Sequence, residues 1–497
     1  MKARSGTLFF SMVVLVSGLG GRPTLLAAVD LPAVFGDHMV LQQDRPVPVW
    51  GTAAKGEPVR VLLGDKVVAS GVADSTGNWK LQLPPLPPGP VPDLTIEGEN
   101  RIVLKDVLAG EVWLCSGQSN MRMTVSATPK CDYGGVVGEE KEVQAADLPE
   151  IRFFDGTWKV CSPETVGSAY AMAYFFGKKL HQELGHPVGL LQAAVGGSPI
   201  ESWVAPSVWS DDLKRRSVEA YRPEYAIRME DHAKDLRAWQ EADGKKRRAK
   251  PNAPPSPEKY PANFSKLFER LIQPLVPYAI RGVLWYQGET NAWRSEPYRD
   301  LLAGLISSWR GEWQDPELSF LIVQLANWGQ TEKYLRASGL WAELRAMQAG
   351  VARETPHCGL VVTLDIGDAV NLHPRNKPEA GRRAALVALA TVYDRDIPAF
   401  GPEPTEAEWT AANTRVSFKH VAQGLKLDAV SGGFEVAGED GGKFTPAEAR
   451  VDGDSVVVSA DGVKDPKVIR YAWKDNPEGL LRNSDGLPAA PFRIERP

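Results

Sequence analysis

Four short segments of this chain carry residues that together could catalyse acyl transfer. Ser119, Gly197 (or Gly196), Asn291 and His373 each follow an apolar run. A serine hydroxyl becomes a strong nucleophile when an adjacent base takes its proton, and histidine is the usual base because its pKa lies near neutral. A glycine N–H, an asparagine amide and the N–H of Ser119 itself can bind the oxyanion of a tetrahedral intermediate. The set predicts Ser119 as nucleophile, His373 as base, and Ser119, Gly197 and Asn291 as an oxyanion hole.

The elements that must position these residues begin near residue 108, where apolar strands start to alternate with helices. Near-continuous apolar strands separated by helices indicate a parallel sheet covered on both faces, whose ligands bind at the carboxyl ends of the strands. All four segments follow strands, so we expect them to meet at one edge of the sheet. We predict strands at 111–115, 188–195, 282–287, 319–326 and 360–366, and helices at 169–184, 298–309, about 334–352 and about 376–393.

Two β-rich regions flank this α/β region. Residues 29–107 combine short apolar runs with turn signals and read as a small β-sandwich, and a β pattern returns from residue 405 to residue 497. The catalytic domain is therefore expected over 108–404, with a charged, proline-rich insertion at about 205–262. A basic run at 245–250 within this insertion could bind an anionic substrate, but a solvated helix end and loop explains it more simply.

The overall composition excludes several classes of protein. The chain has 497 residues, enough for about three domains. Its net charge of −5 gives no support for a nucleic-acid partner.

Residues 1–28 read as a signal peptide, so we expect a secreted or periplasmic protein without a membrane span after cleavage. The four cysteines match no zinc pattern, and Cys131 and Cys161 are the favoured disulfide pair.

Long motifs in this sequence resemble the sialate O-acetylesterase family within the SGNH hydrolases. The resemblance implies a three-layer α/β SGNH domain flanked by β-domains, and an O-acetylated carbohydrate as substrate. It implies the same roles for Ser119, His373, Gly197 and Asn291, and it implies no metal and no organic cofactor. The motifs are DHMVLQQDRPVPVWG (37–51), GEVWLCSGQSNM (110–121), GGSPIESW (196–203), GVLWYQGETNA (282–292), LHPRNKPEAGRR (372–383) and YAWKDNPEGLLRNSDGLPAAPFR (471–493).

The chain departs from the family pattern at the acid that orients the histidine. Many bacterial relatives carry Asp two residues before the histidine, where this chain has Asn371. An Asn can orient an imidazole, but it does not stabilise imidazolium as a carboxylate does. Asp365, Asp368 and Asn371 are therefore all candidates for this role. Substrate-binding candidates are the polar residues beside the motifs, each of which could instead hold the loops together: Gln118, Glu201, Gln287 and Glu289.

Several functions stay open on the sequence alone. The leading hypothesis is removal of O-acetyl groups from sugars, with sialic acid, acetylated xylan and pectic sugars as rival substrates. A carbohydrate-binding protein with a degenerate esterase site is a rival of another class, which Asn371 favours and the intact Ser119 and His373 oppose. A lipid-directed esterase is a third hypothesis. The flanking domains and the insertion are expected to set the choice of substrate.

Overall fold

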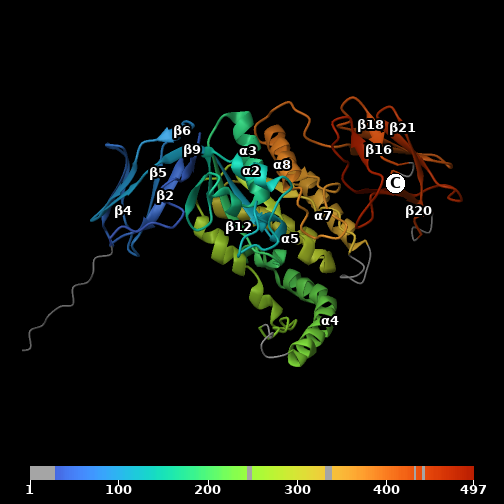
Figure 1. Ribbon diagram of the computed structural model, residues 1–497, viewed down its shortest axis with the longest axis horizontal. Coiled ribbons are helices and arrows are strands. Elements are labelled where there is room, and N and C mark those ends of the chain that lie inside the picture. The colour runs from blue at the N-terminus through green and yellow to red at the C-terminus, as the bar shows by residue number, and fades with distance from the viewer. Residues whose placement is uncertain (1–27, 243–248, 331–338, 430–431, 439–442) are drawn as a thin grey trace, which may run out of the picture.

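The computed structural model describes residues 28–242, 249–330, 339–429, 432–438 and 443–497. The predicted signal peptide, apart from residue 28, and most of the basic run at 245–250 lie outside these residues. The molecule is elongated, with a β-rich region at each end and a mixed region of helices and strands between them (Figure 1). In the described part of the chain, no helix is both long and apolar enough to cross a membrane.

A seven-strand path forms the central sheet, in the order β11-β10-β12-β9-β13-β14-β15. All neighbouring pairs along this path are parallel except β10 and β11, so the sheet predicted as parallel is mixed. The strands are β9 Val107–Gly117, β10 Leu148–Phe154, β11 Trp158–Cys161, β12 Val188–Ala194, β13 Gly282–Tyr286, β14 Ser319–Val323 and β15 Cys358–Val361. Every residue of β9, β12 and β13 is buried, as expected for central strands that pack on both faces.

The helices that connect these strands pack in pairs. Helix α3 (Ala171–Leu184) lies against α8 (Lys377–Thr391), where Gly381 leaves no room for a side chain beside Phe175. Helix α5 (Tyr298–Trp313) lies against α7 (Leu340–Glu354). Two short helices, α1 (Ser119–Arg122) and α2 (Glu139–Gln144), follow β9.

The insertion forms one long helix, α4 (Asp211–Glu241), which projects from the central region (Figure 1). Ser210 caps it by accepting a hydrogen bond from the Leu213 N–H. Few of its residues are buried, because most of the helix faces solvent along its length. The chain returns to the sheet through the short π-helix Phe268–Ile272 and the strand β13.

The N-terminal β-rich region is built from two antiparallel sheets, and two of its strands join β9. The sheets are β2 (Val47–Thr52) with β5 (Asn78–Leu83), and β4-β3-β7-β8 with bounds Lys66–Val72, Pro58–Leu63, Leu94–Glu97 and Arg101–Leu104. Strands β1 (Val40–Gln42) and β6 (Gly89–Val91) pair with the first residues of β9. The N-terminal region is therefore continuous with the central sheet through β9.

The C-terminal β-rich region contains two four-stranded sheets and a two-stranded sheet with a core of their own. The first four-stranded sheet is β16 (Glu403–Trp409), β17 (Thr414–Lys419), β22 (Ser455–Ser459) and β21 (Glu448–Asp452). The second is β20 (Thr445–Pro446), β19 (Phe434–Ala437), β23 (Val468–Tyr471) and β25 (Phe492–Glu495). Strands β18 (Leu425–Leu427) and β24 (Leu481–Asn483) form the two-stranded sheet.

The cysteines do not pair as the sequence suggested. Cys131 and Cys161 are free and buried, so the predicted disulfide is wrong. Cys161 ends β11, where its thiol lies 3.8 Å from the carbonyl oxygen of Ala146. Cys115 is buried within β9, as expected for an apolar strand residue.

Candidate active site

Ser119 lies at the carboxyl end of β9, in a turn that only a glycine permits. Gly117 has a φ of 139°, and a Cβ there would lie 2.0 Å from the carbonyl oxygen of Tyr286. The Gln118 N–H donates to the same oxygen at 3.0 Å, which ties the turn to the end of β13. Helix α1 begins at Ser119, whose side chain is largely buried. The backbone N–H of Ser119 is therefore in a first helical turn, where it is not needed for the helix itself.

The glycine pair after β12 lies beside this serine. A Cβ on Gly196 would lie 3.6 Å from the Cβ of Ser119, whereas Gly197 has a φ of 67° and a Cβ there would point into open space. The structure thus places Gly196 against Ser119, and Gly197 at the turn that follows. Both glycines remain candidates for the oxyanion donor.

Asn291 is fully buried, and three protein contacts fix its amide. Its Oδ1 accepts hydrogen bonds from the Ile200 N–H at 2.9 Å and from Gln287 Nε2 at 2.8 Å. Its Nδ2 donates to Glu201 Oε2 at 2.9 Å. The orientation of the amide is therefore set from the Gly196–Gly197 loop as well as from its own loop, and a second Nδ2 hydrogen remains for an oxyanion.

His373 packs face to face on Tyr133, with ring centroids 4.3 Å apart and an interplanar angle of 23°. Its Nε2 is buried and has no hydrogen-bond partner among the described residues, so the ring does not yet hold the Ser119 hydroxyl. Catalytic hydrogen bonds are often long before substrate binds. Burial, and then the charge of Lys377, lower the pKa of His373 to about 4, although Asp132 opposes them. The imidazole is thus neutral at pH 7, as a general base requires.

Asn371 and Asp368 fix the backbone of the histidine loop. Asn371 Oδ1 accepts a hydrogen bond from the backbone N–H of His373 at 2.9 Å. Asp368 Oδ1 accepts from the backbone N–H groups of Val370 and Asn371 at 2.9 and 3.1 Å. Both side chains are exposed and hold the loop in successive turns. These bonds position the backbone that carries the imidazole.

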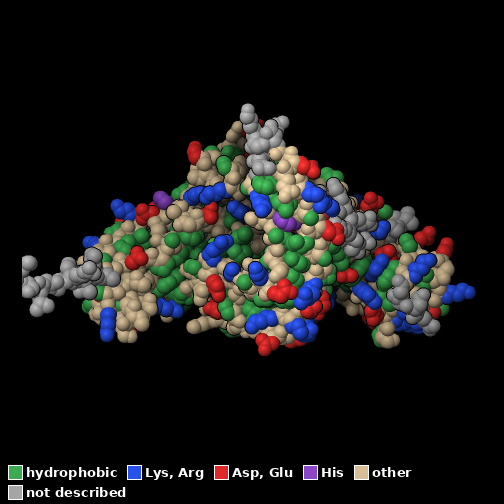
Figure 2. Space-filling view, turned by 90° about the horizontal axis from the view of Figure 1, so that it is seen from below, with side chains coloured by type: hydrophobic (Ala, Val, Ile, Leu, Met, Phe, Trp, Pro, Cys, Tyr) green, Lys and Arg blue, Asp and Glu red, His purple; other side chains and the backbone are tan. Residues whose placement is uncertain are grey.

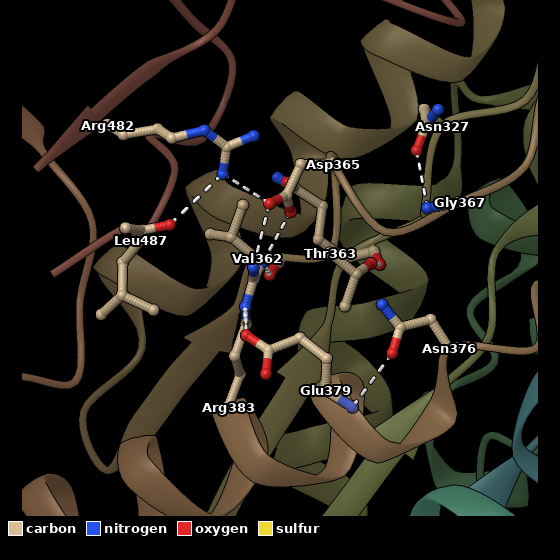
Figure 3. Close-up of polar contacts among 12 residues, drawn as sticks. Asn327, Val362, Thr363, Asp365, Gly367, Asn376, Glu379, Arg383, Arg482 and Leu487 are labelled. Carbon is tan, nitrogen blue, oxygen red and sulfur yellow. Dashed lines mark hydrogen bonds and ion pairs between the residues drawn. The ribbon is translucent and has the colours of Figure 1, made fainter. Parts of the chain in front are cut away.

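Asp365, the third candidate for orienting His373, lies in a buried ion pair instead (Figure 3). Arg383 of α8 contacts both of its carboxylate oxygens, at 2.5 and 2.9 Å. Arg482 of the C-terminal β-rich region donates to Oδ2 at 2.6 Å. Burial raises the pKa of Asp365, but these guanidinium groups bring it below its ordinary value. The structure therefore assigns Asp365 to the contact between the central and C-terminal regions.

The variant Asp365→Asn tests whether Asp365 holds the central and C-terminal regions together or orients His373. We expect the free energy of unfolding to fall by about 3 kcal/mol, because two guanidinium groups would lose a buried anionic partner. We expect kcat to stay within about 3-fold of the wild type well below the melting temperature. Chemical denaturation and steady-state kinetics on one preparation test this. A loss of kcat near 10⁴-fold in a folded variant would instead place Asp365 on the histidine.

The four substrate-binding candidates are buried and hold loops together. Gln118 Oε1 accepts long hydrogen bonds from the Gly288 and Thr290 N–H groups, at 3.4 and 3.3 Å. Glu201 pairs with Arg294 at 3.0 Å and accepts from the Tyr260 hydroxyl at 3.1 Å, besides its bond to Asn291. These contacts favour the loop-holding alternative for both residues.

Gln287 and Glu289 differ from Gln118 and Glu201 in one respect. Each keeps a buried oxygen, Oε1 of Gln287 and Oε2 of Glu289, without a hydrogen-bond partner in the described part of the chain. Gln287 Nε2 also donates to the Ser198 carbonyl at 3.2 Å, and Glu289 Oε1 accepts from Asn120 Nδ2 at 2.5 Å.

Three residues at this site were not predicted from the sequence. Tyr133 and Asp132 come from the loop between α1 and α2, which follows no strand directly. Lys377 begins α8 and is 1% exposed, although its side chain is charged. A lysine four residues after the candidate base, at the first turn of an apolar helix, was the one available hint of a buried cation.

Comparison with known proteins shows the family of this chain. The family model described as carbohydrate esterase, sialic acid-specific acetylesterase, matches residues 109–275 and 237–389. The chain is similar to sialate O-acetylesterases from Rattus norvegicus and Homo sapiens, each 27% identical, over 92% of this chain and 92% and 91% of theirs. It is also similar to the solved structure of a carbohydrate acetylesterase from Xanthomonas citri, with 31% identity, a TM-score of 0.77, and coverage of 94% of this chain and 100% of that one.

The matched residues contain all four candidate segments of the site, from the turn after β9 to the histidine loop before α8. They also cover more than half of the chain. The protein is therefore an ester hydrolase that belongs to the carbohydrate esterase family of sialic acid-specific acetylesterases.

Proposed function

We propose that this protein removes O-acetyl groups from an acidic sugar of the sialic acid type, through an acetyl-Ser119 intermediate. Ser119 and Gly196 lie together beyond the ends of β9 and β12, and Tyr133, on which His373 stacks, lies beside Gly196; this arrangement carries the proposal. It fits an SGNH domain, because helices α3, α7 and α8 pack against strands of the central sheet. Acetylated xylan is the rival substrate, because the catalytic residues contact the acetyl group and not the sugar.

The proposed reaction needs only groups of this chain and water. Ser119 Oγ attacks the acetyl carbonyl carbon while His373 Nε2 takes the hydroxyl proton. The oxyanion binds the Ser119 N–H, a glycine N–H of the Gly196–Gly197 loop and Asn291 Nδ2. The bond to the sugar oxygen then breaks as His373 returns the proton to that oxygen. Water, deprotonated by His373, then attacks the acetyl-enzyme. His373 gives this proton to Ser119 Oγ as the ester bond breaks, and acetic acid leaves and ionises to acetate.

Two basic residues, one in the π-helix and one in the turn before it, support an acidic sugar. A cavity of about 490 Å³ is lined by the Gly196–Gly197 loop, by α4 and by the π-helix Phe268–Ile272 with the turn before it. Lys266 and Arg270 line it, are exposed, and have no acidic partner among the described residues. The face from which α4 projects is hollowed near its centre, and Lys and Arg side chains lie around the hollow (Figure 2). A sugar carboxylate bound in this cavity would be separated from Ser119 by the Gly196–Gly197 loop, which lines the cavity and lies beside Ser119.

Two acetylated substrates test the function. Acetate release is measured from O-acetylated sialic acid and from acetylated xylan, with Ser119→Ala as the control. Release from the first substrate that the alanine abolishes supports the proposal. Preference for xylan would overturn the acidic-sugar assignment and keep the esterase mechanism. No Ser119-dependent release from either, with Ser119 unreactive toward an organophosphate, would overturn the mechanism.

Lys266→Ala/Arg270→Ala tests the basic cavity directly. We expect kcat/KM for O-acetylated sialic acid to fall by about 10-fold or more, mainly through KM, because two charge-assisted contacts to a carboxylate are lost. Activity on p-nitrophenyl acetate, which has no carboxylate, should stay within about 2-fold. The matched control is Lys55→Ala/Lys66→Ala, two exposed lysines of the N-terminal region. Equal loss on both substrates would contradict carboxylate recognition by this pair.

We also propose that residues 1–28 are a signal peptide and that the mature protein is secreted or periplasmic. The apolar run from residue 7 to residue 19 after Lys2 and Arg4 supports this. N-terminal sequencing of the mature protein tests it.

A further inference from the structure

A buried lysine joins the two loops that carry the proposed catalytic groups. Lys377 is the first residue of α8, and its side chain points inward rather than to solvent. Its Nζ donates to Asn120 Oδ1 at 2.8 Å and to the Pro374 carbonyl oxygen at 2.8 Å. Asn120 directly follows Ser119, and Pro374 directly follows His373. One ammonium group therefore bridges the immediate neighbours of nucleophile and base.

Asn120 completes the connection from the other side. Its Nδ2 donates to the Leu372 carbonyl oxygen at 3.1 Å and to Glu289 Oε1 at 2.5 Å. Leu372 precedes His373, so both neighbours of the histidine are hydrogen-bonded to the pair Lys377–Asn120. Glu289 belongs to the loop after β13, which also carries Asn291. Three catalytic loops thus meet in one buried cluster of Lys377, Asn120 and Glu289.

We propose that Lys377 is a positioning residue, which fixes His373 relative to Ser119 through Asn120 and acts on the base through its positive charge. This inference rests on the proposed roles of Ser119 and His373, and it adds a group that the reaction scheme does not use. Burying an ammonium costs free energy that a structural role would not need, since an apolar side chain could fill the same space. Glu289 favours the charged form of Lys377, although burial raises the pKa of the Glu289 carboxyl itself.

The charges around the two groups define the expected pH behaviour. His373 faces Lys377 from α8 and Asp132 and Tyr133 from the loop between α1 and α2. Lys377 faces Glu289, Cys131 and the ring of Tyr286. Burial lowers the pKa of Lys377 to about 7, which Glu289 opposes, so Lys377 is charged throughout the acid range in which His373 titrates. Its positive charge disfavours imidazolium and adds to the larger effect of burial, which keeps His373 neutral.

Lys377→Met is the principal test, because methionine is unbranched, is only one atom shorter than lysine, and removes the charge. We expect kcat for acetate release to fall by about 10- to 100-fold, with KM changed by less than about 3-fold, because the catalytic groups would lose their alignment. We also expect the acid limb of kcat/KM against pH to move up by about one pH unit, since imidazolium would no longer be repelled. Lys55→Met is the control, an exposed lysine at which neither value should change.

Two further variants keep the test decisive if Lys377→Met folds poorly. Lys377→Met/Glu289→Gln removes both charges together, which costs less than leaving one buried charge alone. It should fold and still show the lower kcat and the raised acid limb. Lys377→Arg keeps the charge in a different shape, so kcat should fall while the acid limb stays in place.

The outcomes separate this proposal from the proposed function. A folded Lys377→Met, or the double variant, with wild-type kcat and an unmoved acid limb would overturn the positioning role. A lower melting temperature with a proportionate loss of organophosphate-reactive Ser119, and an unmoved acid limb, would also overturn it, because that is a purely structural effect. Failure of the proposed function would appear earlier, as wild-type protein with no Ser119-dependent activity.

Discussion

Ser119→Ala should lower kcat for acetate release by about 10⁴-fold or more, to the level that binding and the oxyanion donors provide alone. Ser119 Oγ is the atom that forms the covalent intermediate, and alanine offers no atom for that bond. KM should change little, because the substrate contacts and the glycine loop beside Ser119 stay in place. Steady-state acetate release at several substrate concentrations measures both quantities.

Ser116→Ala is the matched control for this variant. Ser116 lies in β9, three residues before Ser119, and it is fully buried. Its hydroxyl has no hydrogen-bond partner in the described part of the chain. Removing that hydroxyl should leave kcat within about 2-fold. Labelling with a fluorescent organophosphate should occur in the wild type and in Ser116→Ala, and be lost in Ser119→Ala. Residual turnover above 10% in Ser119→Ala would show that another nucleophile operates.

The meeting of the candidate residues could be predicted from the sequence because it follows from strand order. The apolar runs that become β9, β12 and β13 are long and continuous, and these strands are neighbours in the sheet. Their registers place Gly117 beside both Ala194 and Tyr286. Turns that follow three aligned strand ends must lie together, so the serine, glycine and asparagine loops converge without any information on side-chain contacts.

Other features depend on contacts between segments far apart in the chain, and these could not be predicted. The segments that form the antiparallel pair β10 and β11 have no continuous apolar run, so no strand was predicted there. Tyr133 reaches His373 from a loop 240 residues earlier in the chain, so no local pattern announces the stacking. The favoured disulfide was wrong for the same reason, because a shared loop-rich region says little about the distance between Cys131 and Cys161 in space.

Spacing in the sequence alone could not decide which residue orients His373. Asp365, Asp368 and Asn371 lie within eight residues of His373, and spacing allowed any of them to orient the ring. The structure separates them by their partners. Asp365 binds Arg482, which lies 117 residues away, whereas Asp368 and Asn371 bond to backbone N–H groups of their own loop. Stacking on Tyr133 orients the imidazole in a way that no motif encodes.

His373→Ala should lower kcat by about 10⁴-fold at pH 7, because no other group in the site would take the proton of Ser119. Removing the His373 imidazole also leaves a space of the shape of an imidazole ring beside Tyr133. Added free imidazole can stack there and accept the same proton, so it should restore part of the activity. It should not restore Ser119→Ala, which lacks the atom that must be deprotonated.

The pH dependence of this rescue distinguishes a buried base from an ordinary one. In the wild type, burial and Lys377 lower the pKa of His373 to about 4. A base works when it is unprotonated, so wild-type kcat/KM should rise with pH near that value and be constant by about pH 6. Free imidazole in solution has an ordinary pKa, so the rescued activity of His373→Ala should rise only near pH 6.5 to 7, roughly the unperturbed histidine range. Coincident acid limbs would show that the protein does not lower the pKa of its base, and an absence of rescue together with near-normal kcat would remove His373 from the reaction.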